Sequence, residues 1–210
     1  MSEAPEAAAP LAAPSDRRCG FVATVGAPNV GKSTLVNALV GAKVTIVSPK
    51  VQTTRAIMRG IAIEGDAQLI FVDTPGIFSP RRRLDRAMVA TAWSGAHDAD
   101  VVALMIDAKR GLDNESAAIA AKLANVPAPK ILIVNKVDLV AKPSLLGLVA
   151  AANEGAHYAA TFMVSALSGS LMWSALLMML SCVNSSGKSM LPAGRLTMIP
   201  IAPSEECAHI

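Results

Sequence analysis

Short, uninterrupted runs of apolar residues recur along the middle of the 210-residue chain, and each run ends at a polar or glycine-containing turn. Their length and their aliphatic, often β-branched composition are typical of buried strands. We therefore expect strands at Phe21–Val25, Leu69–Val72, Val101–Ile106, Ile131–Val134 and Thr161–Val164. Segments able to form helices lie between these runs, at Lys32–Val40, Arg83–Ala96 and Glu115–Ala124.

This alternation of strands and helices predicts an α/β fold with a mostly parallel sheet and helices on both faces. A sheet of this kind places its ligand-binding loops at the carboxyl ends of the strands. Gly60–Gly65 together with Leu69–Val72 has the pattern of an antiparallel edge hairpin joined to that sheet.

The two ends of the chain differ in composition from the middle. Residues 1–18 are rich in Ala and Pro without a periodic apolar pattern, so we expect a disordered arm. From 155 to 187 there is no Asp, Glu, Lys or Arg, and Leu171–Val183 is apolar on nearly every side. This run is shorter than the ~20 residues that span a bilayer. It is either a buried terminal helix or a segment that lies on a membrane surface or aggregates, and residues 184–210 are expected to be unstructured.

Composition excludes several classes of protein. With 52% hydrophobic and 17% charged residues the chain has ample material for a core, which argues against global disorder. The three cysteines and three histidines are scattered, without metal-ligand or disulfide spacing, and fit a reducing cytosol. A net charge of +3 is too small for a continuous basic face that binds nucleic acid.

The segment GAPNVGKS follows a predicted strand and precedes a predicted helix, which is the context of a phosphate-binding loop. Such a loop turns its N–H groups toward an anion, and the helix that follows adds its positive end. Lys32 is then expected to reach the β- and γ-phosphates and Ser33 to bind Mg²⁺. The residues expected to contact a nucleotide here are Gly26, Ala27, Pro28, Asn29, Val30, Gly31, Lys32, Ser33 and Thr34.

A second motif, DTPG, ends the strand Leu69–Val72. Its position places the Asp73 carboxylate close to the Mg²⁺ that Ser33 would hold, where it can bind a metal-coordinated water. Gly76 can offer its N–H to the γ-phosphate and change conformation when that group leaves. We expect all four residues at the site: Asp73, Thr74, Pro75 and Gly76.

A third motif, NKVD, ends the strand Ile131–Val134. The Asp138 carboxylate can accept two hydrogen bonds from guanine N1–H and the exocyclic amine, which adenine cannot supply. The alternative is a solvated helix start with Asp138 as its cap. After the next strand, the Ala166 N–H is expected to meet guanine O6. This motif and the tripeptide after the next strand add Asn135, Lys136, Asp138, Ser165, Ala166 and Leu167 to the expected site.

The link KVQTTR, residues 50–55, precedes the edge hairpin. A threonine there can complete the coordination of Mg²⁺ only when the γ-phosphate is present, which would order the segment. Either Thr53 or Thr54 could serve, and we favour Thr54. The alternative is a plain polar loop.

These five elements, in this order, resemble the translation-factor-like GTPases. GAPNVGKSTLVNALVG, SPKVQTTR, FVDTPGI, RRRLDRAMV and NKVD followed by VSAL are similar to the Era family of bacterial GTPases, over 19–169. The related MnmE and Der GTPases share the P-loop but match the QTTR context and the arginine-rich stretch less well; they are the alternative family.

The resemblance implies the three-layer P-loop NTPase fold and a GTPase that binds GTP and GDP with Mg²⁺, with Lys32, Thr54 and Gly76 as its catalytic residues. It implies a role in maturation of the small ribosomal subunit, with the 16S rRNA and the 30S particle as partners. It also implies a cytoplasmic monomer that associates peripherally with the inner membrane. Asn29 stands where relatives hold K⁺, and Ile77 where Ras-like switches place a water-orienting glutamine.

Era proteins continue after the G domain into an RNA-binding KH domain, whose GxxG loop clamps the RNA backbone. No such pattern follows Gly169 here, and the uncharged sequence rich in Met, Ser and Cys that begins at Ser170 resembles translation in a shifted reading frame. We therefore expect an Era-type G domain over 19–183 without a KH domain. Two origins remain open: a truncated or frameshifted product that binds nucleotide without RNA, and a naturally divergent tail.

Overall fold

The computed structural model describes residues 18–47, 57–64, 67–80, 82–154 and 156–169. Four expectations therefore lie outside the described residues. They are the disordered arm at 1–17, the segment 50–55 with Thr53 and Thr54, the apolar run Leu171–Val183 and the tail at 184–210.

The described residues form strands and helices in regular alternation. The strands are β1 (Arg18–Gly26), β2 (Met58–Glu64), β3 (Ala67–Asp73), β4 (Val101–Asp107), β5 (Lys130–Asn135) and β6 (Ala160–Val164). The helices are α1 (Lys32–Val40), α2 (Arg83–His97), α3 (Asn114–Leu123) and α4 (Lys142–Glu154), with a 3₁₀ turn at Val137–Leu139. The expected strands are all present with slightly longer bounds, and β1 begins at Arg18, inside the expected arm.

The strands form one six-stranded sheet in the order β2-β3-β1-β4-β5-β6. Every neighbouring pair is parallel except β2 and β3, which are antiparallel at the edge. The mostly parallel sheet and its edge hairpin are therefore confirmed. The register pairs Thr24 of β1 with Asp73 of β3, so the two strands end at the same level.

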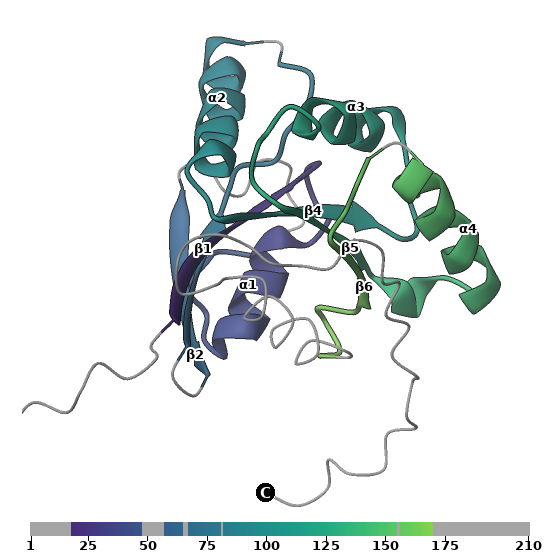
Figure 1. The fold of residues 1–210 in the computed structure, drawn as a ribbon, viewed down its shortest axis with the longest axis horizontal. Coiled ribbons are helices and arrows are strands. Elements are labelled where there is room, and N and C mark those ends of the chain that lie inside the picture. The colour runs from purple at the N-terminus through teal and green to yellow at the C-terminus, as the bar shows by residue number, and fades with distance from the viewer. Residues whose placement is uncertain (1–17, 48–56, 65–66, 81, 155, 170–210) are drawn as a thin grey trace, which may run out of the picture.

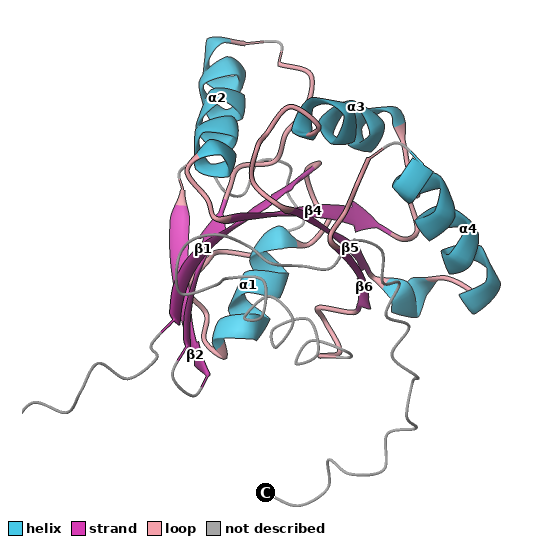
Figure 2. Ribbon diagram, viewed as in Figure 1, coloured by secondary structure: helices cyan, strands magenta, loops and turns pink. Residues whose placement is uncertain are grey.

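Helices cover the sheet from both sides. Helix α1 lies on one face, and α2 and α3 lie on the other, with α4 beside α3 (Figures 1 and 2). The central strands are consequently buried on both faces: all seven residues of β4 are buried, as are Ile131, Leu132, Ile133 and Val134 of β5. A strand covered twice needs apolar residues at every position, which explains the uninterrupted apolar runs of the sequence.

Helix α4 is absent from the helices expected above. Its apolar face consists of Leu145, Val149 and Ala152, which are buried and follow helical spacing. Pro143 lies in the first turn, where its missing N–H has no intrahelical acceptor. A face of three residues is a weak periodic signal, so packing against the sheet decides this helix more than its own pattern.

Local hydrogen bonds fix the starts of the two helices on the upper face. In α2 the Asp85 carboxylate accepts from the Arg82 N–H at 2.9 Å. In α3 Asp113 accepts from the Ser116 N–H at 2.8 Å. Both carboxylates satisfy N–H groups that a helix end leaves without acceptors. Across the described ranges, no helix combines the length and the apolarity that a membrane crossing requires.

Five parallel strands place their carboxyl ends along one edge of the sheet. Those ends carry Gly26, Asp73, Asp107, Asn135 and, after Val164, Ser165. The polar residues that the sequence places far apart therefore meet at this edge, which is where an α/β sheet binds its ligands.

A pair of glycine substitutions tests this packing. A Cβ on Gly60 of β2 would lie 2.8 Å from Val40 and 3.0 Å from Val36 of α1, whereas a Cβ on Gly147 of α4 meets nothing within 4 Å. We expect Gly60→Ala to lower the free energy of unfolding by about 1–3 kcal/mol, because the added methyl overpacks the interface with α1. Gly147→Ala should raise it by about 0.5–1 kcal/mol through helix propensity. Denaturant unfolding measures both, and equal effects of one sign would contradict this packing.

Candidate functional site

The loop between β1 and α1 directs each of its backbone carbonyls to a specific donor. Lys32 Nζ donates to Gly26 O at 3.1 Å and to Ala27 O at 3.0 Å. The Ile77 N–H also donates to Gly26 O, at 3.0 Å. Leu35, in the first turn of α1, donates its N–H to Gly31 O at 2.9 Å.

The three carbonyls in between accept from side chains of distant segments. Arg110 Nη1 donates to Pro28 O at 3.3 Å, and Lys136 Nζ donates to Asn29 O at 2.8 Å. Asn135 Nδ2 donates to Val30 O at 2.8 Å. All six carbonyls from Gly26 to Gly31 thus accept a hydrogen bond, and those of Pro28, Asn29 and Val30 accept it from side chains of distant segments.

This arrangement sets the direction of the loop's N–H groups. The N–H and C=O of a trans peptide point in opposite directions, so amides whose carbonyls turn outward face the inside of the loop. Asn29 and Gly31 have positive φ of 63° and 99°, which curls the chain into an anion-binding concavity. Gly31 is required by sterics as well, because a Cβ there would collide with Asn135 Nδ2.

Lys32 is a buried cation at the floor of this concavity, with 7% of its surface exposed. Burial lowers the pKa of Lys32 to about 8, and the nearby Asp73 carboxylate opposes that decrease. A charged ammonium held in a low-dielectric site is costly until an anion compensates it. The loop therefore has both the geometry and the charge for phosphate.

Ser33 and Asp73 meet beside Lys32. The Ser33 hydroxyl donates to Asp73 Oδ2 at 2.7 Å, and Asp73 is completely buried. A hydroxyl and a carboxylate are hard oxygen ligands, the type that Mg²⁺ prefers. These two residues therefore fit a magnesium site, and the sequence expectation for this pair agrees with their contact.

The residues after Asp73 pass directly against the P-loop. Thr74 Oγ1 donates to Thr24 O at 2.7 Å, which ties the turn to β1. A Cβ on Gly76 would lie 2.9 Å from Pro28 Cα, so only glycine fits this close approach without displacing the loop. Asp73 and Gly76 therefore lie against the P-loop and the start of α1, as their expected place at the site requires.

At the other end of the site, Asn135 joins the third motif to the last one. Its Oδ1 accepts from the Ala166 N–H at 3.0 Å while its Nδ2 binds the P-loop. The Ala166 N–H, which we expected to meet a base, is thus donated to a side chain in this structure. Ser165 is buried, and Leu167 is 87% exposed.

Asp138 lies in the 3₁₀ turn after β5 and is exposed at the same edge of the sheet. The residue in the N-cap position of that turn is Lys136, in a left-handed conformation with φ of 63°. Asp138 is therefore an exposed residue in the first turn of this short helix and is not its cap.

Three further residues shape the site and were not predicted from the sequence. Asp107, which ends β4, is 5% exposed and accepts from Lys136 Nζ at 2.6 Å. Its signal was available, because it is a polar residue directly after a buried strand, as Asp73 and Asn135 are. Arg110 carried no signal, since a loop arginine is ordinary.

Asn37 of α1 is the third residue that shapes the site and was not predicted from the sequence. Its Oδ1 accepts from the N–H groups of Val44 and Thr45 at 2.9 and 2.8 Å, and its Nδ2 donates to Thr45 O at 2.9 Å. Thr45 Oγ1 in turn donates to Ser33 O at 3.1 Å. Asn37 thereby fixes the start of the segment that leads toward 48–56.

Known proteins share this arrangement. The family described as "50S ribosome-binding GTPase" matches residues 21–136. GTPase Era of Bradyrhizobium sp. (strain ORS 278) is 73% identical over 152 residues, which cover 72% of this chain and 50% of that protein. GTPase Era of Rhizobium meliloti is 63% identical over 153 residues, covering 73% of this chain and 49% of that protein. The chain thus spans about half the length of these curated relatives.

A solved structure of Era in complex with MgGDPNP and nucleotides 1506–1542 of 16S ribosomal RNA matches with a TM-score of 0.72 and 34% identity. The match covers 89% of this chain and 60% of that one. A variant of Era from Aquifex aeolicus bound to GDP·AlF₄⁻ matches with a TM-score of 0.71 and 34% identity, over 87% of this chain and 60% of that one.

The burial of Lys32 predicts an unusual response to its removal. We expect Lys32→Met to raise the free energy of unfolding of the ligand-free protein by about 1–2 kcal/mol at pH 7, because the relief of a buried charge exceeds the loss of two hydrogen bonds. Between pH 8 and 10.5 the unfolded chain keeps a proton on Lys32 that the folded chain has lost. The free energy of unfolding of the unsubstituted protein should therefore increase as the pH rises from 8 to 10.5.

Denaturant unfolding across this pH range measures the difference between the two proteins. The stability advantage of Lys32→Met should shrink as the pH rises. A substitution that destabilises the protein equally at every pH would contradict a lowered pKa of Lys32.

Proposed function

The chain belongs to the family of 50S ribosome-binding GTPases, and from that membership we propose that it binds GTP and GDP with Mg²⁺ and hydrolyses GTP slowly, as a switch. It is a homologue of GTPase Era over the nucleotide-binding half of that protein. The observation that carries the proposal is the P-loop: each of its six carbonyls accepts a hydrogen bond, and its buried Lys32 supplies a positive charge, which together suit a triphosphate.

The phosphates would lie in the concavity at the start of α1. The amides of residues 29–33 and the positive end of the helix would bind the β- and γ-phosphates. Lys32 would exchange the carbonyls of Gly26 and Ala27 for phosphate oxygens, which compensates the charge that is costly in the free protein. The Gly76 N–H would bind the γ-phosphate from the opposite side.

Ser33 and Asp73 would hold the magnesium ion, with Thr54 as a further ligand in the triphosphate state. When bound, Mg²⁺ neutralises charge that develops on the β- and γ-phosphate oxygens. The hydrogen bond between Ser33 and Asp73 keeps these two oxygens together in the ligand-free protein. The site is therefore prepared before the nucleotide arrives.

Asp138 would select guanine through paired hydrogen bonds, and Asn135 and Lys136 would position the base-binding loops against the P-loop. Specificity of this type is strong, because an adenine base would leave the carboxylate without donors. Ala166 would contribute its N–H to the base after giving up Asn135 Oδ1.

Hydrolysis is expected to be slow. Ile77 is 6% exposed and offers no donor or acceptor from its side chain, so it cannot orient a water molecule. Catalysis would rest on Lys32, the loop amides and the metal, with a rate on the order of 10⁻⁴–10⁻² s⁻¹ as in unassisted switches. Asn29 is exposed, and it would hold a K⁺ ion that adds positive charge.

The likeness to Era supports a role for this switch in the maturation of the small ribosomal subunit, with 16S rRNA as a partner. We propose a cytoplasmic monomer, since both GTP and ribosomal particles are found in that compartment. We also propose that the protein associates peripherally with the inner membrane.

Calorimetry tests the nucleotide site directly. We expect GTP and GDP to bind and ATP not to bind, with Mg²⁺ strengthening the binding of GTP. Asp138→Asn should lower the affinity for guanine nucleotides by at least about 100-fold and favour the binding of xanthine nucleotides. The reason is that the amide replaces one of the two acceptors of the carboxylate with a donor. The matched control is Asp98→Asn, at the exposed C-terminal end of α2. It should leave the affinity for every nucleotide unchanged. Equal affinities for GTP and ATP would overturn the assignment of Asp138.

Phosphate release tests the role of K⁺. At equal ionic strength we expect GTP hydrolysis to be at least about fivefold faster in potassium than in sodium, because an added cation stabilises the transition-state charge. Asn29→Ala should abolish the difference, while Asn125→Ala at the far end of α3 should preserve it. Equal rates in both salts, together with an unaltered Asn29→Ala rate, would refute the proposed K⁺ site.

A further inference from the structure

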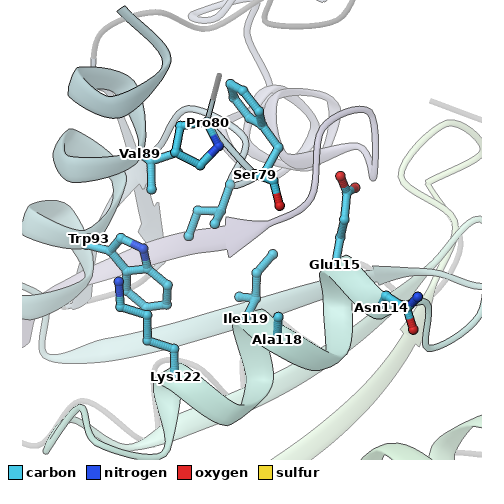
Figure 3. Close-up of a pocket in the computed structure, with 11 residues that line it drawn as sticks. Ser79, Pro80, Val89, Trp93, Asn114, Glu115, Ala118, Ile119 and Lys122 are labelled. Atoms are coloured by element: carbon cyan, nitrogen blue, oxygen red, sulfur yellow. The ribbon is translucent and has the colours of Figure 1, made fainter. Parts of the chain in front are cut away.

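A cavity of about 320 Å³ lies on the upper face of the molecule, between α2, α3 and the segment Ile77–Pro80 (Figure 3). Val89 and Trp93 form the wall from α2, and Ala118 and Ile119 form the wall from α3. Its volume is sufficient for one or two large apolar side chains, and its position is outside the nucleotide cradle. We call this cavity the α2–α3 groove.

Cations flank the apolar floor of the α2–α3 groove. Lys122 Nζ lies 4.4 Å from the centroid of the Trp93 ring, at the rim (Figure 3). Arg86 is exposed and lies on the same helical face as Val89 and Trp93, one turn nearer the start of α2. Neither cation forms an ion pair with another residue in the described part of the chain.

The acidic residue in the lining, Glu115, shares its cationic partner with one neighbouring carboxylate. Glu115 lies 3.2 Å from Arg110 Nη2, and Asp113 pairs with the same guanidinium. The Arg110 cluster therefore keeps one net negative charge at the start of α3, whereas Lys122 and Arg86 add two positive charges beside the apolar recess. That combination complements an apolar anchor flanked by carboxylates.

Two chains of contacts connect the groove with the P-loop. Ile77 lines the groove, and its N–H donates to Gly26 O at 3.0 Å. Glu115 also lines it, and its partner Arg110 donates to Pro28 O at 3.3 Å. An occupant that moves either wall therefore moves a carbonyl of the phosphate-binding loop.

We propose that the α2–α3 groove is a docking site for an acidic, amphipathic segment of a partner protein, and that docking is coupled to the nucleotide site. The segment inserts an apolar side chain between Val89 and Ile119 and places carboxylates at Lys122 and Arg86. The coupling rests on the proposed GTP-binding function, whereas docking itself does not.

Three other occupants fit the groove less well. The chain's own stretch from 155 to 187 has no charged residue and cannot complement Lys122 or Arg86. An RNA backbone would use the cations but leave the apolar recess empty. A lipid surface is flat, whereas the recess requires a protruding group.

The test uses the full 210-residue chain with Trp173→Phe, which leaves Trp93 as its single tryptophan. The probe is a short amphipathic peptide with leucines on one face and glutamates on the other. The control peptide has lysine in place of each glutamate. We expect the acidic peptide to change Trp93 fluorescence saturably and the basic peptide to bind at least about tenfold more weakly. Equal binding of both peptides, or binding of neither, would overturn the proposal.

Charge reversal locates the site. Lys122→Glu and Val89→Glu should each lower the affinity for the acidic peptide by at least about fivefold. Lys122 is exposed, so its variant stays informative where Val89→Glu fails to fold. Lys43→Glu, an exposed position just after α1 on the opposite face of the sheet, is the matched control and should leave binding unchanged. A Lys122→Glu variant that binds the peptide normally would disprove docking in the groove.

Competition identifies the occupant. Displacement of the peptide by an RNA of the 16S 3′ region, or by anionic vesicles, would assign the groove to those ligands and overturn the proposal. Self-association that Lys122→Glu abolishes would assign it to a second copy of the chain, with the same consequence.

The coupling has a separate readout. Peptide affinity should differ by at least about threefold between the GDP-bound protein and the protein bound to a non-hydrolysable GTP analogue, with a reciprocal shift in nucleotide affinity. Equal affinities would overturn the coupling. Peptide binding by a protein that binds no guanine nucleotide would instead contradict the proposed function.

Discussion

A loop that binds an anion through its N–H groups must direct its carbonyl oxygens elsewhere, and here every carbonyl from Gly26 to Gly31 has a donor of its own. The donors come from α1, from the segment after β3, from the loop after β4 and from the end of β5. The four elements after β1 therefore meet around one short stretch of backbone. Losing one donor would free a carbonyl to turn inward, where it would repel phosphate.

Burial gives the site its charge balance. Lys32 and Asp73 lie in the same dry environment, and the attraction of Asp73 offsets only part of the desolvation that lowers the pKa of Lys32. The free protein therefore contains a costly cation whose cost a bound phosphate would remove. A bound phosphate would therefore stabilise the fold, and part of the cost of the buried charge would contribute to affinity.

The same backbone also connects the site with its surroundings. Ile77 and Arg110 each contact a P-loop carbonyl and belong to, or pair with, the lining of the α2–α3 groove. A packed wall transmits displacement because protein interiors are dense. The proposed α2–α3 groove therefore lies next to the phosphate-binding loop, and only one or two residues connect them.

The sequence by itself determined the strands, the mostly parallel sheet and the motif residues, because a strand buried on both faces is written as an apolar run and a phosphate loop as glycines before Lys32. It did not determine helix α4, whose apolar face is too short to signal itself. Tertiary structure alone decided the partners of Arg110 and Asp107, the pKa of Lys32 and the α2–α3 groove. Asn135 and Val30 are 105 residues apart in the chain. A contact over such a separation, like the burial of a charge, exists only once the sheet brings the strand ends together.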